Sequence, residues 1–143
     1  MKKTIGFLLT FPVLLWAAVP AAVADTSAIS TMAEIVMHLN HYPSDSEKQT
    51  LARIVHNEHA TAGEKALAGA LIRMRHSVGG SDAAALRELA SDTHATKQER
   101  ELADVLLGIT HHPSASDRQR LQSLLGSSAG GKASHRRRGS WGY

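Results

Sequence analysis

Apolar residues recur along this chain at a fixed spacing of 35 residues. Leu51, Leu86 and Leu121 form one such column, and other columns also keep an apolar residue in all three copies. Those columns are Ile54/Leu89/Leu124, Met32/Leu67/Leu102, Ala33/Ala68/Ala103, Val36/Leu71/Leu106 and Leu39/Met74/Ile109. The three copies align without an insertion. A sustained period of this length is typical of an array of small structural repeats.

Each copy predicts two helices. In the first, the apolar positions recur at i, i+1, i+4 and i+7, which places them along one face of an amphipathic helix. Thr61 with Glu64 and Thr96 with Glu99 have the spacing of a capping box, and Thr26 holds the same column in the first copy. The second helices are predicted to begin at Ser46, Ser81 and Ser116. The six predicted helices cover residues 27–41, 47–58, 62–76, 82–93, 97–111 and 117–126.

The two helices of one copy cannot bury their apolar faces alone, whereas three stacked copies form a continuous core. We therefore predict an all-α fold in which three stacked helical hairpins of the 35-residue repeat form a short α-solenoid. This domain is expected to span residues 25–126, because Thr26 would cap its first helix.

The segment before this domain has the pattern of a secretory signal peptide. Lys2 and Lys3 precede an almost wholly apolar run over residues 5–19, and Ala22-Val23-Ala24 matches the small-x-small cleavage site. We expect residues 1–24 to be removed on export to a bacterial periplasm, which leaves no integral membrane contact. A membrane-spanning helix is the alternative, and it needs a longer apolar run of about 20 residues.

The composition narrows the chemistry of the remaining chain. There is no cysteine, so disulfides, thiolate nucleophiles and cysteine-ligated metals are excluded. Two of the 16 basic residues lie in the signal segment and four in the tail, whereas all 13 acidic residues lie in between. Residues 25–126 therefore carry a net charge of −3. An acidic body argues against a nucleic-acid partner, because nucleic-acid binders carry basic surfaces.

The last segment, residues 127–143, is rich in Ser, Gly, Lys and Arg, which favours disorder. Arg136, Arg137 and Arg138 precede Trp141 and Tyr143. Such a basic tail suits contact with an anionic membrane surface or an acidic partner, and it also aids solubility.

The repeat period, the two-helix unit and the segments Leu67-Ala68-Leu71 and Leu102-Ala103-Leu106 resemble tetratricopeptide-like repeats, and HEAT-like stacking is a similar match. The resemblance implies a scaffold whose first helices line a concave face that binds a protein or peptide. It assigns three cations and three apolar residues to that face: Lys65, Arg73, Arg100, Met37, Ile72 and Leu107. The alternative is that the cations form a solvated face and that the apolar column is buried core.

Eight histidines lie in the body of the chain. His38 and His41, and likewise His56 and His59, are three residues apart, and this spacing puts two imidazoles on one helix face where copper, nickel or zinc could bind. A histidine-based metal-binding protein is therefore the alternative function. A second account applies to five recurring histidines, which would stabilise helix C-termini: His41, His76, His111, His59 and His94.

The chain contains no Gly-x-Ser-x-Gly or His-Glu-x-x-His motif and no phosphate-binding glycine loop. Its acidic residues are accounted for as helix caps or exposed helix positions. The sequence therefore predicts a protein that is not an enzyme and that needs no cofactor, apart from the metal of the alternative function.

Overall fold

The computed structural model describes residues 27–129. This part of the chain is all-α, as predicted, with six helices and no strand among its elements. The helices are α1 (Ala28–Met37), α2 (Asp45–His56), α3 (Ala62–Arg73), α4 (Gly80–Ser91), α5 (Lys97–Gly108) and α6 (Ala115–Ala129). The predicted signal peptide, and the tail from residue 130 onward, lie outside the described residues. Within the described residues, no helix is both long enough and apolar enough to cross a membrane.

The second helices begin two residues earlier than predicted. Ser44 caps α2, because its hydroxyl accepts a hydrogen bond from the N–H of Glu47 and the Glu47 carboxylate accepts one from the N–H of Ser44 at 2.7 Å. Ser114 and Asp117 repeat this arrangement at the start of α6. A carboxylate three residues after the serine closes the box and also favours the positive end of the helix. The predicted caps at Ser46 and Ser116 have only a glutamine at that place.

The N-terminal caps of the first helices agree more closely with the sequence. Thr61 and Thr96 form the expected capping boxes with Glu64 and Glu99. In α1 the cap is Ser27, whose hydroxyl accepts from the N–H of Ser30 at 3.2 Å, one residue later than the predicted Thr26. At the other end of the domain, α6 continues three residues beyond its predicted end at 126.

The first helices end earlier than predicted, at Met37, Arg73 and Gly108. The reason is one apolar column. Leu39, Met74 and Ile109 are 6%, 3% and 1% exposed, and the chain must leave the helix to turn these side chains onto the core. Met74 and Ile109 have ψ angles of 136° and 127°, which are extended rather than helical. The recurring histidines two residues further on therefore lie in the links and not on the helices.

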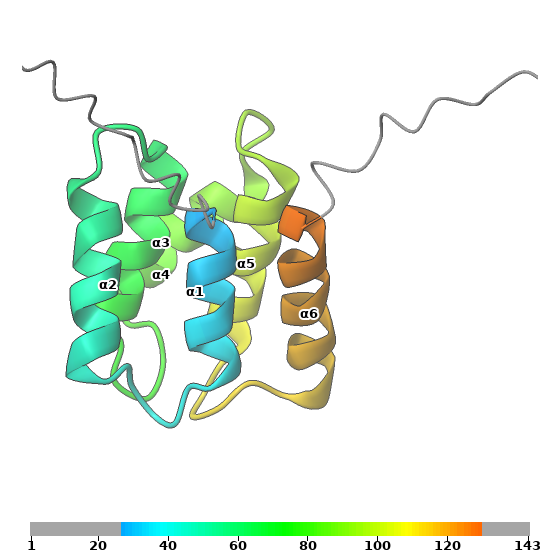
Figure 1. Cartoon of the computed structure of the whole chain (residues 1–143). Helices are drawn as coiled ribbons and strands as arrows, with labels where there is room; N and C mark the ends of the chain where they lie inside the picture. The colour runs from blue at the N-terminus through cyan, green and yellow to red at the C-terminus, as the bar shows by residue number, and fades with distance from the viewer. Residues whose placement is uncertain (1–26, 130–143) are drawn as a thin grey trace, which may run out of the picture.

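The six helices form a closed ring (Figure 1). The first helices α1, α3 and α5 contact one another, and each second helix contacts the two first helices beside it. The most extensive contacts join α2 with α3, α4 with α5 and α1 with α6. The two terminal helices thus form the third tight pair. The α-solenoid arrangement is not confirmed, since it would leave α1 and α6 at opposite ends.

The physical reason for the closure is a wide apolar face on the first helices. Ile35, Ala70 and Val105 form a further column at the 35-residue spacing, and they are 7%, 2% and 0% exposed. This column widens the stripe that the sequence analysis identified, so each first helix must be covered on both sides. In an open stack the outer side of α1 would face water. Packing α1 against α6 buries it.

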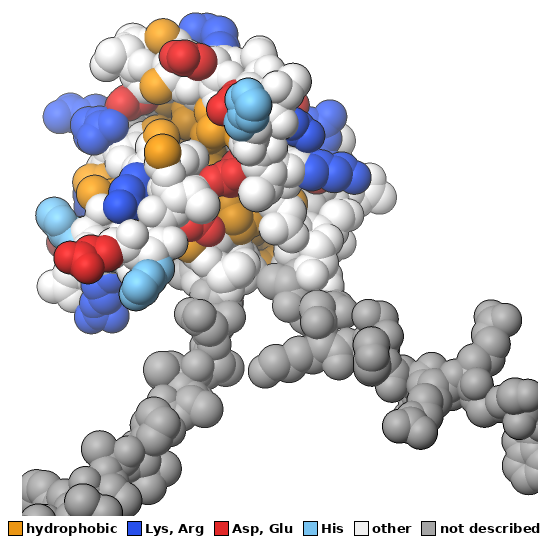
Figure 2. All heavy atoms as spheres, turned by 90° about the horizontal axis from the view of Figure 1, so that it is seen from above, with side chains coloured by type: hydrophobic (Ala, Val, Ile, Leu, Met, Phe, Trp, Pro, Cys, Tyr) orange, Lys and Arg blue, Asp and Glu red, His pale blue; other side chains and the backbone are white. Residues whose placement is uncertain are grey.

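The closure places equivalent segments together at each end of the bundle. The links that follow α1, α3 and α5 all lie at one end, which we call the link end (Figure 1). The start of α1 and the end of α6 lie at the opposite end. Figure 2 looks down on that opposite end, where Lys and Arg side chains stand around the rim with Asp and Glu between them. Its visible surface therefore carries mixed charge.

In a closed ring, equivalent core residues of the three copies should contribute equally to the free energy of unfolding. Leu51, Leu86 and Leu121 are each 0% exposed, one on each second helix. We expect Leu→Ala at each position to lower the free energy of unfolding by about 2–5 kcal/mol, because the lost side chain leaves a cavity. The three values should agree within about 1 kcal/mol in urea denaturation. A markedly smaller loss for Leu121→Ala would contradict the closure, since α6 would then be a loosely held end.

Candidate functional site

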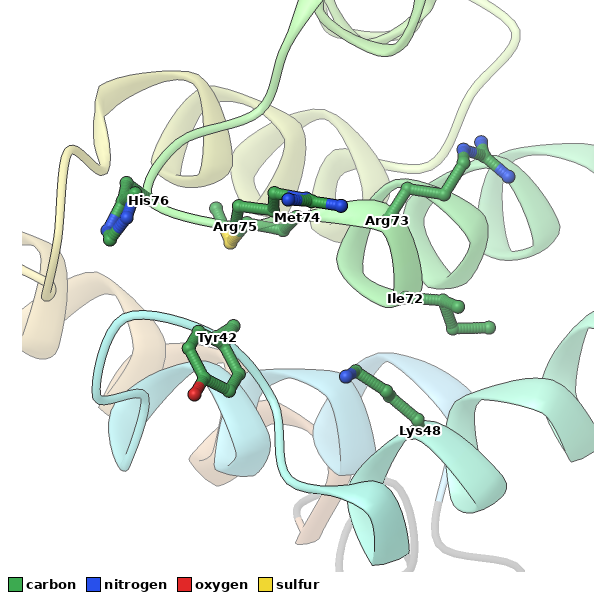
Figure 3. A pocket seen from close by; sticks show the side chains of 7 residues that line it. All are labelled: Tyr42, Lys48, Ile72, Arg73, Met74, Arg75 and His76. Atoms are coloured by element: carbon green, nitrogen blue, oxygen red, sulfur yellow. The ribbon is translucent and has the colours of Figure 1, made fainter.

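A groove lies between the α1–α2 link and the end of α3, at the link end of the bundle (Figure 3). Its volume is about 530 Å³, a size typical of small-molecule and short-peptide sites. Tyr42 and Lys48 form one wall and face the segment 72–76 across the opening. The lining residues are Tyr42, Lys48, Ile72, Arg73, Met74, Arg75 and His76.

The charge of this groove is one-sided. Three of its lining residues are Lys or Arg, a fourth is His76, and none is acidic. Lys48 Nζ lies 5.5 Å from the centre of the Tyr42 ring, within the range of a cation–π attraction. Its Nζ is also 3.9 Å from the carboxylate of Asp45, a side chain exposed to solvent. An acidic body thus presents a cationic groove.

Arg73 is anchored beside the groove by Asp82 of α4. Its Nε and Nη2 donate to the two carboxylate oxygens at 2.9 and 2.6 Å, a bidentate pair that joins the end of α3 to the start of α4. The hydrogen bond from Arg73 lowers the pKa of Asp82 and outweighs the opposing effect of burial. The guanidinium side chain remains 62% exposed, so it can still meet a ligand.

The floor of the groove is apolar, and one aromatic ring is uncovered. Met74 is 3% exposed and Ile72 is half-buried against the core. Tyr42 is 57% exposed, and it is the one large apolar side chain among the described residues with such exposure. An uncovered aromatic ring beside cations is an arrangement suited to contact with a ligand.

Two of the six residues assigned to a partner-binding face lie in this groove, namely Ile72 and Arg73. Met37 and Leu107 are half-buried against the core on the other two first helices. Lys65 lies in the first turn of α3, at the opposite end of that helix from the groove. Arg100 Nη1 donates to the carbonyl of Asp92 at 3.1 Å. Four of the other groove residues lie in the links, where no helical periodicity marks a binding face, and Lys48 lies in the first turn of α2.

The histidines of the alternative metal site lie at both ends of α2. His38 and His41 precede this helix, whereas His56 is its last residue and His59 follows it. A helix of 12 residues is about 18 Å long, so the two pairs cannot bind one ion together. Within residues 27–129, no group of three or more His, Asp or Glu side chains is arranged as a metal site in the conformation described.

The structure brings a different set of histidines together. The ring centres of His41, His76 and His111, which we call the histidine triad, are 5.3–5.6 Å apart at the link end. The backbone N–H of His41 donates to the carbonyl of His111 at 3.1 Å, joining the first and third links. From the sequence, this column is predicted to stabilise helix C-termini, and His41 is also part of a predicted metal-binding pair.

At the opposite end, Glu99 is a charged residue that is 4% exposed. Its carboxylate accepts hydrogen bonds from the Thr61 hydroxyl and from the N–H of Thr96, the latter at 2.7 Å. Burial raises the pKa of Glu99, but hydrogen bonds from Thr61, Thr96 and the backbone of Glu64 together lower it by more, so that the pKa lies below its usual range. The sequence predicted this residue as a cap for α5. Its link to the cap of α3 is visible only in the structure.

In comparisons with known proteins, no family model matches this chain, and no curated protein or solved structure is significantly similar to it. The geometry of the described residues is therefore the basis for any proposal of function.

The lowered pKa of Glu99 predicts acid-sensitive stability. A carboxyl group with a depressed pKa stabilises the fold above its unfolded pKa of about 4.3 and loses that effect as the pH falls through its folded pKa. We expect Glu99→Gln to lower the free energy of unfolding by about 1–3 kcal/mol at pH 7. Urea denaturation should show this difference shrinking below about pH 4. Glu58→Gln, at an exposed position near the same end, is the control and should have little effect. A difference that stayed constant with pH would contradict the role of the charge.

Gly63 provides the space that the Glu99 carboxylate occupies. A Cβ at position 63 would lie 2.5 Å from Glu99 Oε1 and 3.1 Å from Leu89 Cδ1. Gly→Ala normally stabilises a helix by about 1 kcal/mol. We expect Gly63→Ala instead to destabilise the fold by about 1–2 kcal/mol in urea denaturation, because Glu99 is held by its hydrogen bonds.

Two controls make this prediction specific. Gly126→Ala should be neutral or stabilising, because a Cβ there meets nothing within 4 Å. In a chain that already carries Glu99→Ala, the Gly63→Ala substitution should destabilise the fold much less. An equal cost in both backgrounds would mean that Glu99 is not the obstacle.

Proposed function

We propose that this chain is an exported, non-catalytic helical binding protein that holds an acidic peptide segment in the groove beside Tyr42. The observation that carries the proposal is the groove itself, which combines a cationic wall with an apolar floor. Lys48, Arg73 and Arg75 would attract carboxylates, and Met74 and Ile72 would receive an apolar side chain. The pattern of residues 1–24 supports export to a bacterial periplasm.

The roles of the cations follow from their surroundings. Arginine can bind a carboxylate through two parallel hydrogen bonds, whereas lysine acts as a point charge. Arg73 is already oriented by Asp82, so little side-chain freedom is lost when it meets a second carboxylate. Lys48 lies against Tyr42 and faces Arg75 and Met74 across the opening (Figure 3). A bound segment would lie between these two walls.

This proposal keeps the kind of partner that the repeat resemblance implied but changes the place of binding. The resemblance placed it on a concave surface along the first helices. In the closed ring, those helices face one another across the core. The links are the segments that remain open to a partner, and the groove is formed largely by two of them.

The test is fluorescence anisotropy with labelled acidic peptides of four to six residues that contain one leucine and end in a free carboxylate. For the tightest peptide, we expect Lys48→Ala with Arg75→Ala to weaken binding at least tenfold, since charged hydrogen bonds contribute about 1.5–3 kcal/mol each. Arg53→Ala with Arg87→Ala removes the same charge from exposed positions of α2 and α4, and it should change the Kd less than about twofold.

Two outcomes would contradict the proposal. Equal weakening by both double variants would indicate attraction to net charge alone. Equal binding of a peptide in which every acid is replaced by its amide would show that the carboxylates are not recognised.

A further inference from the structure

The link end of the bundle carries a second arrangement, independent of the groove cations. We propose that His41, His76 and His111 form a three-histidine site for a divalent transition-metal ion, such as Zn²⁺, Ni²⁺ or Cu²⁺. Each ligand comes from a different copy of the repeat, so one ion would join all three links.

The spacing of the three rings carries the proposal. Their centres form a nearly equilateral triangle with sides of 5.6, 5.5 and 5.3 Å. An ion bound to an imidazole nitrogen at about 2.1 Å lies about 3.2 Å from the ring centre. The middle of the triangle is also about 3.2 Å from each ring centre. The three ring centres therefore lie at the distance from one point that metal coordination requires, once each ring directs a nitrogen toward it.

The rings must turn to bind. Two of the three ring pairs meet edge to face, at interplanar angles of 83° and 88°, and the third pair is tilted at 46°. The three side chains do not form a metal site in the conformation described. All three side chains are exposed, and turning a ring about its side-chain torsions displaces no core atom. Coordination through one nitrogen leaves the twist of the ring about the metal–nitrogen bond free, so the mutual angles are no obstacle.

Asn40 lies beside one of the proposed ligands. Nδ1 of His41 lies 2.9 Å from Oδ1 of Asn40. In the tautomer that carries its proton on Nδ1, His41 donates a hydrogen bond to this amide oxygen. That tautomer leaves Nε2 of His41 with a lone pair that can bind an ion. Metal-binding histidines are commonly oriented in this way, with the second ring nitrogen donating to a carbonyl or carboxylate.

His41 is held at this place in an unfavourable backbone conformation. Its φ of 74° lies in the left-handed region, which is unfavourable for a residue with a side chain. The hydrogen bond from its N–H to the carbonyl of His111 accompanies that conformation. Strained backbone that persists at one point of a fold often marks a functional site.

The repeat itself supports a role for the imidazoles. Histidine is kept in all three copies, whereas the next three positions vary between them: Tyr42/Ser77/His112, Pro43/Val78/Pro113 and Ser44/Gly79/Ser114. Helix-end stabilisation does not explain this, because the helices end three or four residues earlier and the helix dipole acts within the last turn. Three neutral nitrogen ligands, with a side open to water, suit zinc, nickel and copper rather than magnesium or calcium.

Calorimetric titration with zinc, nickel and copper chlorides tests the proposal. The protein is expressed from its full coding sequence and purified without a histidine tag. We expect one ion per chain with a Kd below about 1 μM for at least one metal. His41→Ala and His111→Ala should each weaken binding at least tenfold, and neither residue lines the groove. Asn40→Ala should weaken it by up to about tenfold, without removing a ligand.

The matched control is His59→Ala with His94→Ala, which removes two exposed recurring histidines at the opposite end and should change the Kd less than twofold. Saturating metal should also raise the Tm of the parent chain but not that of the triple variant H41A/H76A/H111A, because the ion binds only the folded links. Circular dichroism of each variant checks that the fold is kept.

The proposal is wrong if no metal binds at micromolar concentration, or if the control variant loses as much affinity as the triad variants. Peptide binding by the His111→Ala variant separates this result from the groove proposal.

Discussion

The packing of α1 against α6 is the contact on which the rest of the structure depends. It turns a linear repeat into a ring and covers the side of α1 that a linear array would leave in water. The requirement comes from the column of Ile35, Ala70 and Val105, which makes the apolar face of the first helices too wide for one neighbour. A chain with few aromatic residues thereby builds a continuous aliphatic core from small and medium side chains.

Closure also explains how the two ends of the bundle differ. At the end where α1 begins and α6 ends, the caps of α3 and α5 are tied together by the buried carboxylate of Glu99. At the link end, the three links are anchored by the buried side chains of Leu39, Met74 and Ile109. The residues next to those anchors are held close together but remain exposed. This combination of fixed backbone and accessible side chains is what a binding site requires.

The proposed peptide groove and the proposed metal site are neighbours that share His76. The groove depends on cations at its walls, whereas the triad depends on neutral imidazoles. An ion at the triad would hold the link after α3, which is one wall of the groove, in a single position. Metal binding and peptide binding would then be coupled through that link, and by linkage each would change the affinity of the other by the same factor.

Much of this fold follows from local sequence pattern. The capping boxes of Thr61 and Thr96, the apolar stripes and the 35-residue spacing determine six helices, because such signals act within one or two turns. The caps at Ser44 and Ser114 could have been found from the same rule, since a carboxylate follows each serine at the third position. The early ends of the first helices could not, because Leu39, Met74 and Ile109 leave the helix for a core that exists only after packing.

The binding surfaces were decided by the tertiary structure. The periodicity of the chain shows which residues are equivalent but does not show whether equivalent residues meet. In an open stack, His41, His76 and His111 would lie one repeat apart, and Arg73 and Ile72 would belong to a continuous face. Ring closure instead gathers the three links at one end, which brings the histidines within 5.6 Å of one another and forms the groove beside Tyr42. The sequence by itself determined the helices and their 35-residue repeat. Only the contact between α1 and α6 determined which of the repeated residues lie close together.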